Sequence, residues 1–88
     1  MLTREEKEKI IQDFSKHNGD TGSAEVQIAL LTARIKYLTE HMKMHRNDVH
    51  SKLGLISLVS KRTKLLKYLA KSDVKSYREV VQKLNLRK

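Results

Sequence analysis

The chain has 88 residues and no cysteine, which suits one small domain and excludes disulfide bonds and thiolate metal sites. Its 19 lysines and arginines against 10 acidic residues give a net charge of +9, an excess typical of proteins that bind polyanions. No apolar run approaches the roughly 20 residues of a membrane span, and the charged N-terminal stretch lacks the apolar segment of a signal peptide. We therefore expect a single-domain, soluble, cytoplasmic protein with no membrane association.

Proline is absent, and apolar residues recur at helical spacing along most of the chain. This pattern predicts an all-α fold of four helices, in which three pack as a small bundle and the N-terminal helix is loosely attached. The first helix is expected over about residues 4–16, after a capping box formed by Thr3 and Glu6. Its thin apolar face consists of Ile10, Ile11 and Phe14. A helix with so little apolar surface to bury is expected to pack weakly against the rest.

The second helix is expected over about residues 24–45, after a polar loop at residues 17–23 and with Ser23 as its N-cap. On a helical wheel, two apolar stripes flank a narrow polar stripe, which consists of Gln27, Arg34, His41 and His45. The spacing leaves two interpretations open: a seam of satisfied polar groups between helices, or an exposed recognition surface. The opposite face, which includes Glu25 and Thr32, is expected to face solvent.

The third helix is expected over about residues 49–72, with Asp48 as its N-cap. Leucines line one side of it, and the other side carries Ser57, Lys61, Lys64, Tyr68 and Lys71. Tyr68 thus stands among lysines, where an aromatic ring suits stacking on a base while the ammonium groups meet phosphates. Gly54, one turn into the helix, is most simply explained by close helix packing, and the second explanation is close approach of a nucleic-acid backbone.

The fourth helix is expected over about residues 74–85, with Asp73 as its N-cap. Its apolar face, which the spacing marks as core, consists of Val74, Tyr77, Val80, Val81 and Leu84. Residues 49–88 hold eleven basic and two acidic residues, so the whole positive surplus lies in the C-terminal half. A one-sided positive field steers polyanions, which favours nucleic acid as the partner over an anionic membrane surface.

The stretch HMKMHRNDVHS, which begins at His41, has residue types found in metal sites and in catalytic triads. His41 and His45 are four residues apart, but an H-x-x-x-H pair without the glutamate of an H-E-x-x-H motif is a weak signal, so no metal site is expected. Asp48, His50 and Ser51 are sequence neighbours whose side chains splay apart, so no catalysis is expected.

The remaining interpretation of this stretch is a polar patch at a tight turn, where His41, Asp48 and Ser51 would meet. Their donors and acceptors suit base edges and 2′-hydroxyls in the wide, shallow minor groove of an RNA helix. No helix shows the arginine- or asparagine-studded surface of a DNA reader, so a small basic DNA-binding module is the less favoured alternative.

Four motifs together give the chain a specific resemblance to a known family. They are GDTGS (19–23), LTEH (38–41), H-x-x-D-x-H-S (45–51) and R-x-x-L-L-x-Y-L (62–69). With them the chain resembles, over essentially its whole length, the family of bacterial ribosomal small-subunit protein fifteen. The resemblance implies a structural constituent of the small ribosomal subunit, with no enzymatic activity and no cofactor, that is a monomer when free.

The resemblance also implies that the protein binds the central domain of 16S rRNA at a three-way junction and at a G·U/G·C minor-groove site. By motif position, the junction residues would be Thr21, Gly22, Gln27, Arg34, Lys64, Tyr68 and Lys71. The minor-groove residues would be His41, Asp48 and Ser51, with His45 and His50 beside them. Lysine in place of arginine at positions 64 and 71 would keep phosphate contacts but lose a planar, bidentate grip.

Three further partners follow from the resemblance alone. The bound protein would let neighbouring small-subunit proteins join, which nucleates assembly of the platform. Members of the family also contact large-subunit rRNA at a bridge between the subunits. Several members repress their own mRNA.

Overall fold

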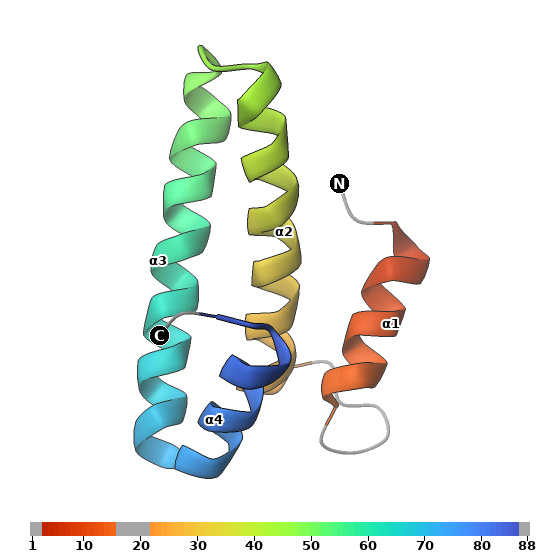
Figure 1. Cartoon of the computed structure of the whole chain (residues 1–88), viewed down its shortest axis with the longest axis vertical. Coiled ribbons are helices and arrows are strands. Elements are labelled where there is room, and N and C mark those ends of the chain that lie inside the picture. The colour runs from red at the N-terminus through yellow and green to blue at the C-terminus, as the bar shows by residue number, and fades with distance from the viewer. Residues whose placement is uncertain (1–2, 16–21, 87–88) are drawn as a thin grey trace.

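The computed structural model describes residues 3–15 and 22–86, which form four α-helices and no strand (Figure 1). Helix α1 covers Arg4–Phe14, α2 covers Ala24–Met44, α3 covers Val49–Ser72 and α4 covers Val74–Lys83. The predicted all-α fold is therefore confirmed. Among the described residues, no helix combines the length and the apolar character needed to cross a bilayer.

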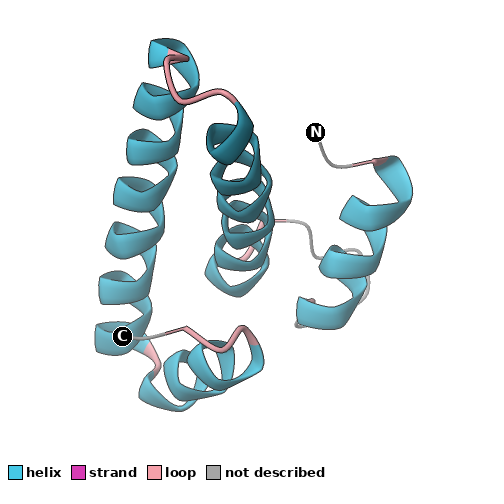
Figure 2. Ribbon diagram, turned by 45° about the horizontal axis from the view of Figure 1, so that its top comes forward, coloured by secondary structure: helices cyan, strands magenta, loops and turns pink. Residues whose placement is uncertain are grey.

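The two longest helices, α2 and α3, run antiparallel as a hairpin whose turn lies at one end of the molecule (Figure 1). The short α4 folds back across the other end of this hairpin, and α1 lies beside α2 (Figures 1 and 2). The hairpin therefore has one end covered by α4 and one end that projects away from it.

Short polar side chains start each helix, as the capping pattern predicts. Before α1, the Glu6 N–H donates to Thr3 Oγ1 (3.1 Å) and the Thr3 N–H donates to Glu6 Oε1 (2.9 Å). The Thr3 N–H stabilises the ionised carboxylate and so lowers the pKa of Glu6. Before α2, the hydroxyl of Ser23 accepts from the Val26 N–H at 3.3 Å. The predicted caps Thr3 and Ser23 are therefore confirmed.

The core lies at the end of the hairpin that α4 covers. It is built on Ile28, Leu69 and Val80, one from each of α2, α3 and α4. Leu65 and Tyr77 are among the half-buried residues that pack against this cluster. No residue from 32 to 68 is buried, so the far half of the hairpin is held by half-buried contacts alone.

Helix α1 is attached less firmly than the other three. It has no buried residue, and its apolar side chains Ile10, Ile11 and Phe14 are only half-buried. From α4, the Lys83 ammonium group donates to the Asp13 carbonyl at 2.7 Å and lies 4.5 Å from the centre of the Phe14 ring. This agrees with the predicted loose attachment of the first helix.

The prediction that Glu25 and Thr32 of α2 face solvent is wrong. Glu25 is 7% exposed, and it lines a hollow together with Phe14 at the end of α1 and Val80 of α4. Thr32 is half-buried, and its hydroxyl accepts a hydrogen bond of 3.3 Å from the Arg62 guanidinium of α3. The helical wheel groups residues by face but does not show which neighbouring helix covers that face.

Helix α4 ends at Lys83, two residues earlier than predicted. Asn85 adopts a left-handed conformation with a φ of 57°, which asparagine tolerates better than most residues. The Asn85 N–H then donates to the Gln82 carbonyl (3.2 Å), and the Leu86 N–H donates to the Val81 carbonyl (2.9 Å). The chain therefore turns back over the helix end instead of extending it.

The explanation of Gly54 by close helix packing is wrong. A Cβ atom placed on Gly54 would lie 4.0 Å from Leu38 Cδ1, which is an ordinary contact distance. Alanine would therefore fit between α2 and α3 at this position.

Candidate nucleic-acid interface

A hydrogen-bonded group of three side chains occupies the projecting end of the hairpin. His41 comes from the last turn of α2, Asp48 is the N-cap of α3, and Ser51 lies in the first turn of α3. The carboxylate of Asp48 accepts from the Ser51 N–H (3.1 Å) and from the Ser51 hydroxyl (2.7 Å). The carboxylate oxygen that accepts from the Ser51 hydroxyl, Asp48 Oδ2, also lies 2.9 Å from His41 Nε2. The three predicted patch residues are thus brought together.

The charge state of Asp48 fixes the roles of the other two side chains. The hydrogen bond from the Ser51 hydroxyl, and then that from His41, hold the pKa of Asp48 well below its usual range. An ionised carboxylate only accepts hydrogen bonds, so His41 Nε2 must carry the hydrogen and neutral His41 has an unprotonated Nδ1. The Ser51 hydroxyl donates its hydrogen to Asp48, which leaves its oxygen lone pairs as acceptors. Asp48 therefore orients the His41 ring and the Ser51 hydroxyl.

The other two histidines of this region differ in their relation to the group. The rings of His45 and His41 stack with centroids 4.5 Å apart and planes 25° from parallel. This stacking helps to set the plane of the His41 ring. His50 is exposed on the first turn of α3.

The polar stripe of α2 is an exposed surface. Gln27, Arg34 and His45 are exposed, and the His41 side chain is 30% exposed. The exposed-surface interpretation therefore holds for Gln27, Arg34 and His45, whereas His41 is a hydrogen-bonded polar group between the helices. Gln27 and His41 are fourteen positions apart on one helix, which corresponds to about 21 Å along its axis.

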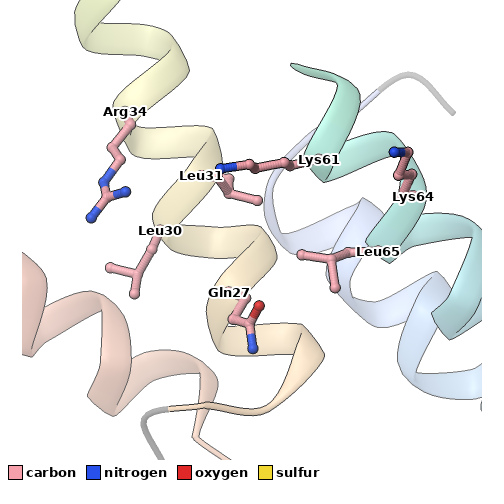
Figure 3. A pocket seen from close by; sticks show the side chains of 7 residues that line it. All are labelled: Gln27, Leu30, Leu31, Arg34, Lys61, Lys64 and Leu65. Carbon is pink, nitrogen blue, oxygen red and sulfur yellow. The ribbon is translucent and has the colours of Figure 1, made fainter. Parts of the chain in front are cut away.

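Near the other end of this stripe, α2 and α3 enclose an open hollow of about 470 Å³. The predicted residues Gln27, Arg34 and Lys64 line it together with Lys61 (Figure 3). Its remaining lining residues are Leu30, Leu31 and Leu65. Their apolar spacing marked them as core, and the sequence holds no signal that they also line a hollow.

Four predicted junction residues do not line this hollow. Three of them are near its lining residues in the sequence, and the fourth lies outside the described ranges. The side-chain amide of Gln27 donates to the Gly22 carbonyl at 2.7 Å, which connects the start of α2 to the preceding loop. Tyr68 is 62% exposed, and Lys71 is exposed one turn further along α3. Thr21 lies outside the described residues.

Within the described ranges, no three histidine, aspartate or glutamate side chains converge as metal ligands would. His41 binds the Asp48 carboxylate through Nε2 instead. The fold and the surface therefore define a small, basic, all-helical protein with a polar and cationic face along one helical hairpin.

Comparison with known proteins agrees with this description. The sequence model of the family described as Ribosomal protein S15 matches residues 7–87. The small ribosomal subunit protein uS15 of Oleidesulfovibrio alaskensis is 59% identical over 88 residues, covering 100% of this chain and 99% of that protein. The proteins of the same description from Dictyoglomus thermophilum and Trichlorobacter lovleyi are 54% and 52% identical, over 99% and 100% of this chain and 98% and 100% of their own lengths.

The chain therefore belongs to the ribosomal protein S15 family and is a structural, non-enzymatic protein of the ribosome. This confirms the resemblance found in its motifs.

Proposed function

We propose that this chain, a structural constituent of the small ribosomal subunit in the cytoplasmic ribosome, is a primary binder of the central domain of 16S rRNA. The projecting end of the hairpin reads a G·U/G·C minor-groove site, and the hollow between α2 and α3 lies against a three-way junction. The observation that carries this proposal is the His41–Asp48–Ser51 group at one end of an exposed polar stripe whose other end borders Arg34, Lys61 and Lys64.

The chemistry of the three-residue group supports the minor-groove assignment. The Ser51 oxygen offers an acceptor, and neutral His41 with its hydrogen on Nε2 offers Nδ1 as a second acceptor, so the group suits partners that donate hydrogen bonds. In the minor groove, guanine presents its N2 amino group as a donor, and each ribose presents a 2′-hydroxyl. A pair that contains guanine would therefore satisfy this group better than an A·U pair.

The other end of the stripe supports the junction assignment through charge and exposure. Lys64, Tyr68 and Lys71 are exposed on one side of α3, so an aromatic ring stands between two ammonium groups. Among the described residues, a Cβ at Gly22 would meet no atom within 4 Å, so packing against them does not require glycine there. A glycine with open space before it suits close approach by an RNA backbone.

Binding at two places would fix how adjoining RNA helices are oriented. That orientation supports the proposed nucleation of platform assembly, in which other small-subunit proteins join afterwards. Contact with large-subunit rRNA at an intersubunit bridge and repression of the chain's own mRNA are parts of the same proposal.

Hydroxyl-radical footprinting on central-domain rRNA tests the two-site arrangement. We expect two separate protected regions, one at the junction and one in a minor groove that contains guanine. A competition assay with duplex DNA is the control, since backbone charge alone would make both competitors effective. One protected region, or equal competition by duplex DNA, would reject the proposal.

Tyr68 gives a test at the level of one residue. Tyr68→Ala should weaken RNA binding by roughly 1–3 kcal/mol if the ring stacks on a base, whereas Tyr68→Phe should bind almost as well as the parent protein. Tyr37, which is 48% exposed and borders α1, provides a matched control as Tyr37→Ala. Equal effects of the two alanine variants on the dissociation constant would remove Tyr68 from the interface.

A further inference from the structure

The hollow between α2 and α3 has an apolar floor. Leu31 is 9% exposed, and Leu30 and Leu65 are half-buried. Figure 3 shows Leu31 and Leu65 pointing into the space between the helices, with Lys61 reaching across it from α3. At about 470 Å³, the hollow falls within the range of roughly 300–1,000 Å³ found for small-molecule sites. It is therefore large enough to take a flat heterocycle.

The rim of the hollow carries three cations, Arg34, Lys61 and Lys64, and no acidic residue of the described ranges lines it. Across the described ranges, none of the three is ion-paired with a carboxylate. Cations gathered without counter-ions repel one another, and a bound anion relieves this repulsion. The rim therefore complements a phosphate group.

Gln27 adds a directional group to this rim. Its amide nitrogen is used in the hydrogen bond to the Gly22 carbonyl. This bond fixes the orientation of the carboxamide and leaves its oxygen as an acceptor. An exocyclic amino group on a base is a donor that this oxygen can accept.

We propose that this hollow is a pocket for one unstacked nucleotide. Its base lies on Leu31 and Leu65, and its phosphates meet Lys61, Lys64 and Arg34. The Gln27 oxygen accepts a hydrogen bond from the edge of the base. The proposal deepens the RNA-binding function proposed above and rests on it, because an RNA junction is where unpaired nucleotides are available.

Leucine methyl NMR tests the pocket directly. With methyl-labelled protein and a central-domain junction RNA, the Leu31 and Leu65 methyl signals should shift upfield, since a stacked base places them over an aromatic ring. A continuous RNA duplex of equal length should bind without such shifts. Replacing the unpaired junction nucleotides one at a time by abasic sites should abolish the shifts at one position.

The other outcomes of this experiment distinguish failure of the pocket from failure of the RNA-binding function. If the junction RNA binds and no methyl signal moves upfield, the pocket is rejected while the RNA-binding function stands. If neither RNA binds, both proposals fall.

Adenosine monophosphate serves as a separate probe: the same methyl shifts on saturation would support a pocket that also takes a free nucleotide. No shift up to millimolar concentrations, together with abasic RNAs that behave like the parent RNA, would reject the pocket.

A matched pair of lysine variants tests the rim. Lys61→Met should reduce the slope of log affinity against log salt by about 0.7–0.9, because one phosphate contact is lost. Lys67→Met removes the same charge from an exposed position on the same helix that does not line the hollow, and it should leave the slope unchanged. Equal slopes for the two variants would reject a phosphate contact at Lys61.

Discussion

Two helices of this protein begin with the same motif, Asp-x-x-Ser, and their first turns are built alike. At α3, Asp48 accepts from the N–H of Ser51 at 3.1 Å and from its hydroxyl at 2.7 Å. At α4, Asp73 accepts from the N–H of Ser76 at 3.1 Å and from its hydroxyl at 2.9 Å. At the start of α3, His41 of the preceding helix also binds the capping carboxylate. The same local motif thus builds a cap at both places, and a residue from another helix gives one of them a recognition surface.

The surroundings of the two caps differ as well. Asp73 directly follows α3 and lies near the core residues Leu69 and Val80 in the sequence. Asp48 lies at the projecting end, where no residue is buried. We therefore expect the α4 cap to matter for folding and the α3 cap to matter for RNA.

The largest expected effect is the difference in RNA affinity between two single variants, Asp48→Ala and Asp73→Ala. Asp48→Ala should weaken RNA binding by roughly tenfold to a hundredfold, because the acceptors of His41 and Ser51 lose the group that orients them. Asp73→Ala should leave the affinity of the folded protein nearly unchanged. Dissociation constants measured at one fixed salt concentration compare the two, and equal losses would show that capping alone sets the affinity.

The next effect separates the histidine from the cap. His41→Ala removes the hydrogen bond between the helices but leaves both bonds from Ser51 to Asp48 in place. We expect RNA affinity to fall by roughly threefold to tenfold with little change in melting temperature. Met44→Ala, at an 83% exposed position in the same last turn of α2, is the control. A large loss of helicity in His41→Ala would instead assign the residue a structural role.

The third effect concerns stability at the α4 cap. Asp73→Ala should lower the free energy of unfolding by about 1 kcal/mol, because the Ser76 N–H loses its capping acceptor at the start of α4. Urea titration followed by circular dichroism measures this change. Ser76→Ala should have a smaller effect, since it keeps the backbone bond. A stability loss larger in Ser76→Ala than in Asp73→Ala would contradict this account of the cap.

The smallest effect is a dependence on pH at the α3 cap. The folded pKa of Asp48 lies below its unfolded value, so its contribution to stability is fully present above the unfolded pKa of about 3.9. That contribution is lost as the pH falls from there through the lowered folded pKa. The difference in melting temperature between the parent protein and Asp48→Asn should therefore stay constant from pH 7 to about pH 5 and shrink below about pH 4. A difference that stays the same below pH 4 would show that the Asp48 pKa is not lowered.

Much of this architecture follows from local rules in the sequence. The absence of proline, the helical spacing of apolar residues and the caps at Thr3, Ser23, Asp48 and Asp73 predict the four helices. The meeting of His41 with Asp48 across a short turn also follows, because a tight connection brings the end of one helix beside the start of the next.

What the sequence does not predict depends on the arrangement of helices in space. Glu25 is buried and lines a hollow together with residues of α1 and α4, so its wheel position misleads. The hollow beside Lys61 requires the relative rotation of α2 and α3, which apolar periodicity leaves undetermined. The roles of His41 and Ser51 as acceptors depend on individual hydrogen bonds to Asp48, which no spacing encodes.

The one-sided core has a consequence for motion. Among the described residues, every buried side chain belongs to residues 25–31 or is Leu69 or Val80, so the tip of the hairpin can open without disrupting this packed interior. Amide hydrogens around residues 41–51 should therefore exchange with solvent through local fluctuations, while those around Leu69 wait for global unfolding. RNA that grips the tip would suppress these fluctuations and extend protection from exchange to the whole length of α2 and α3.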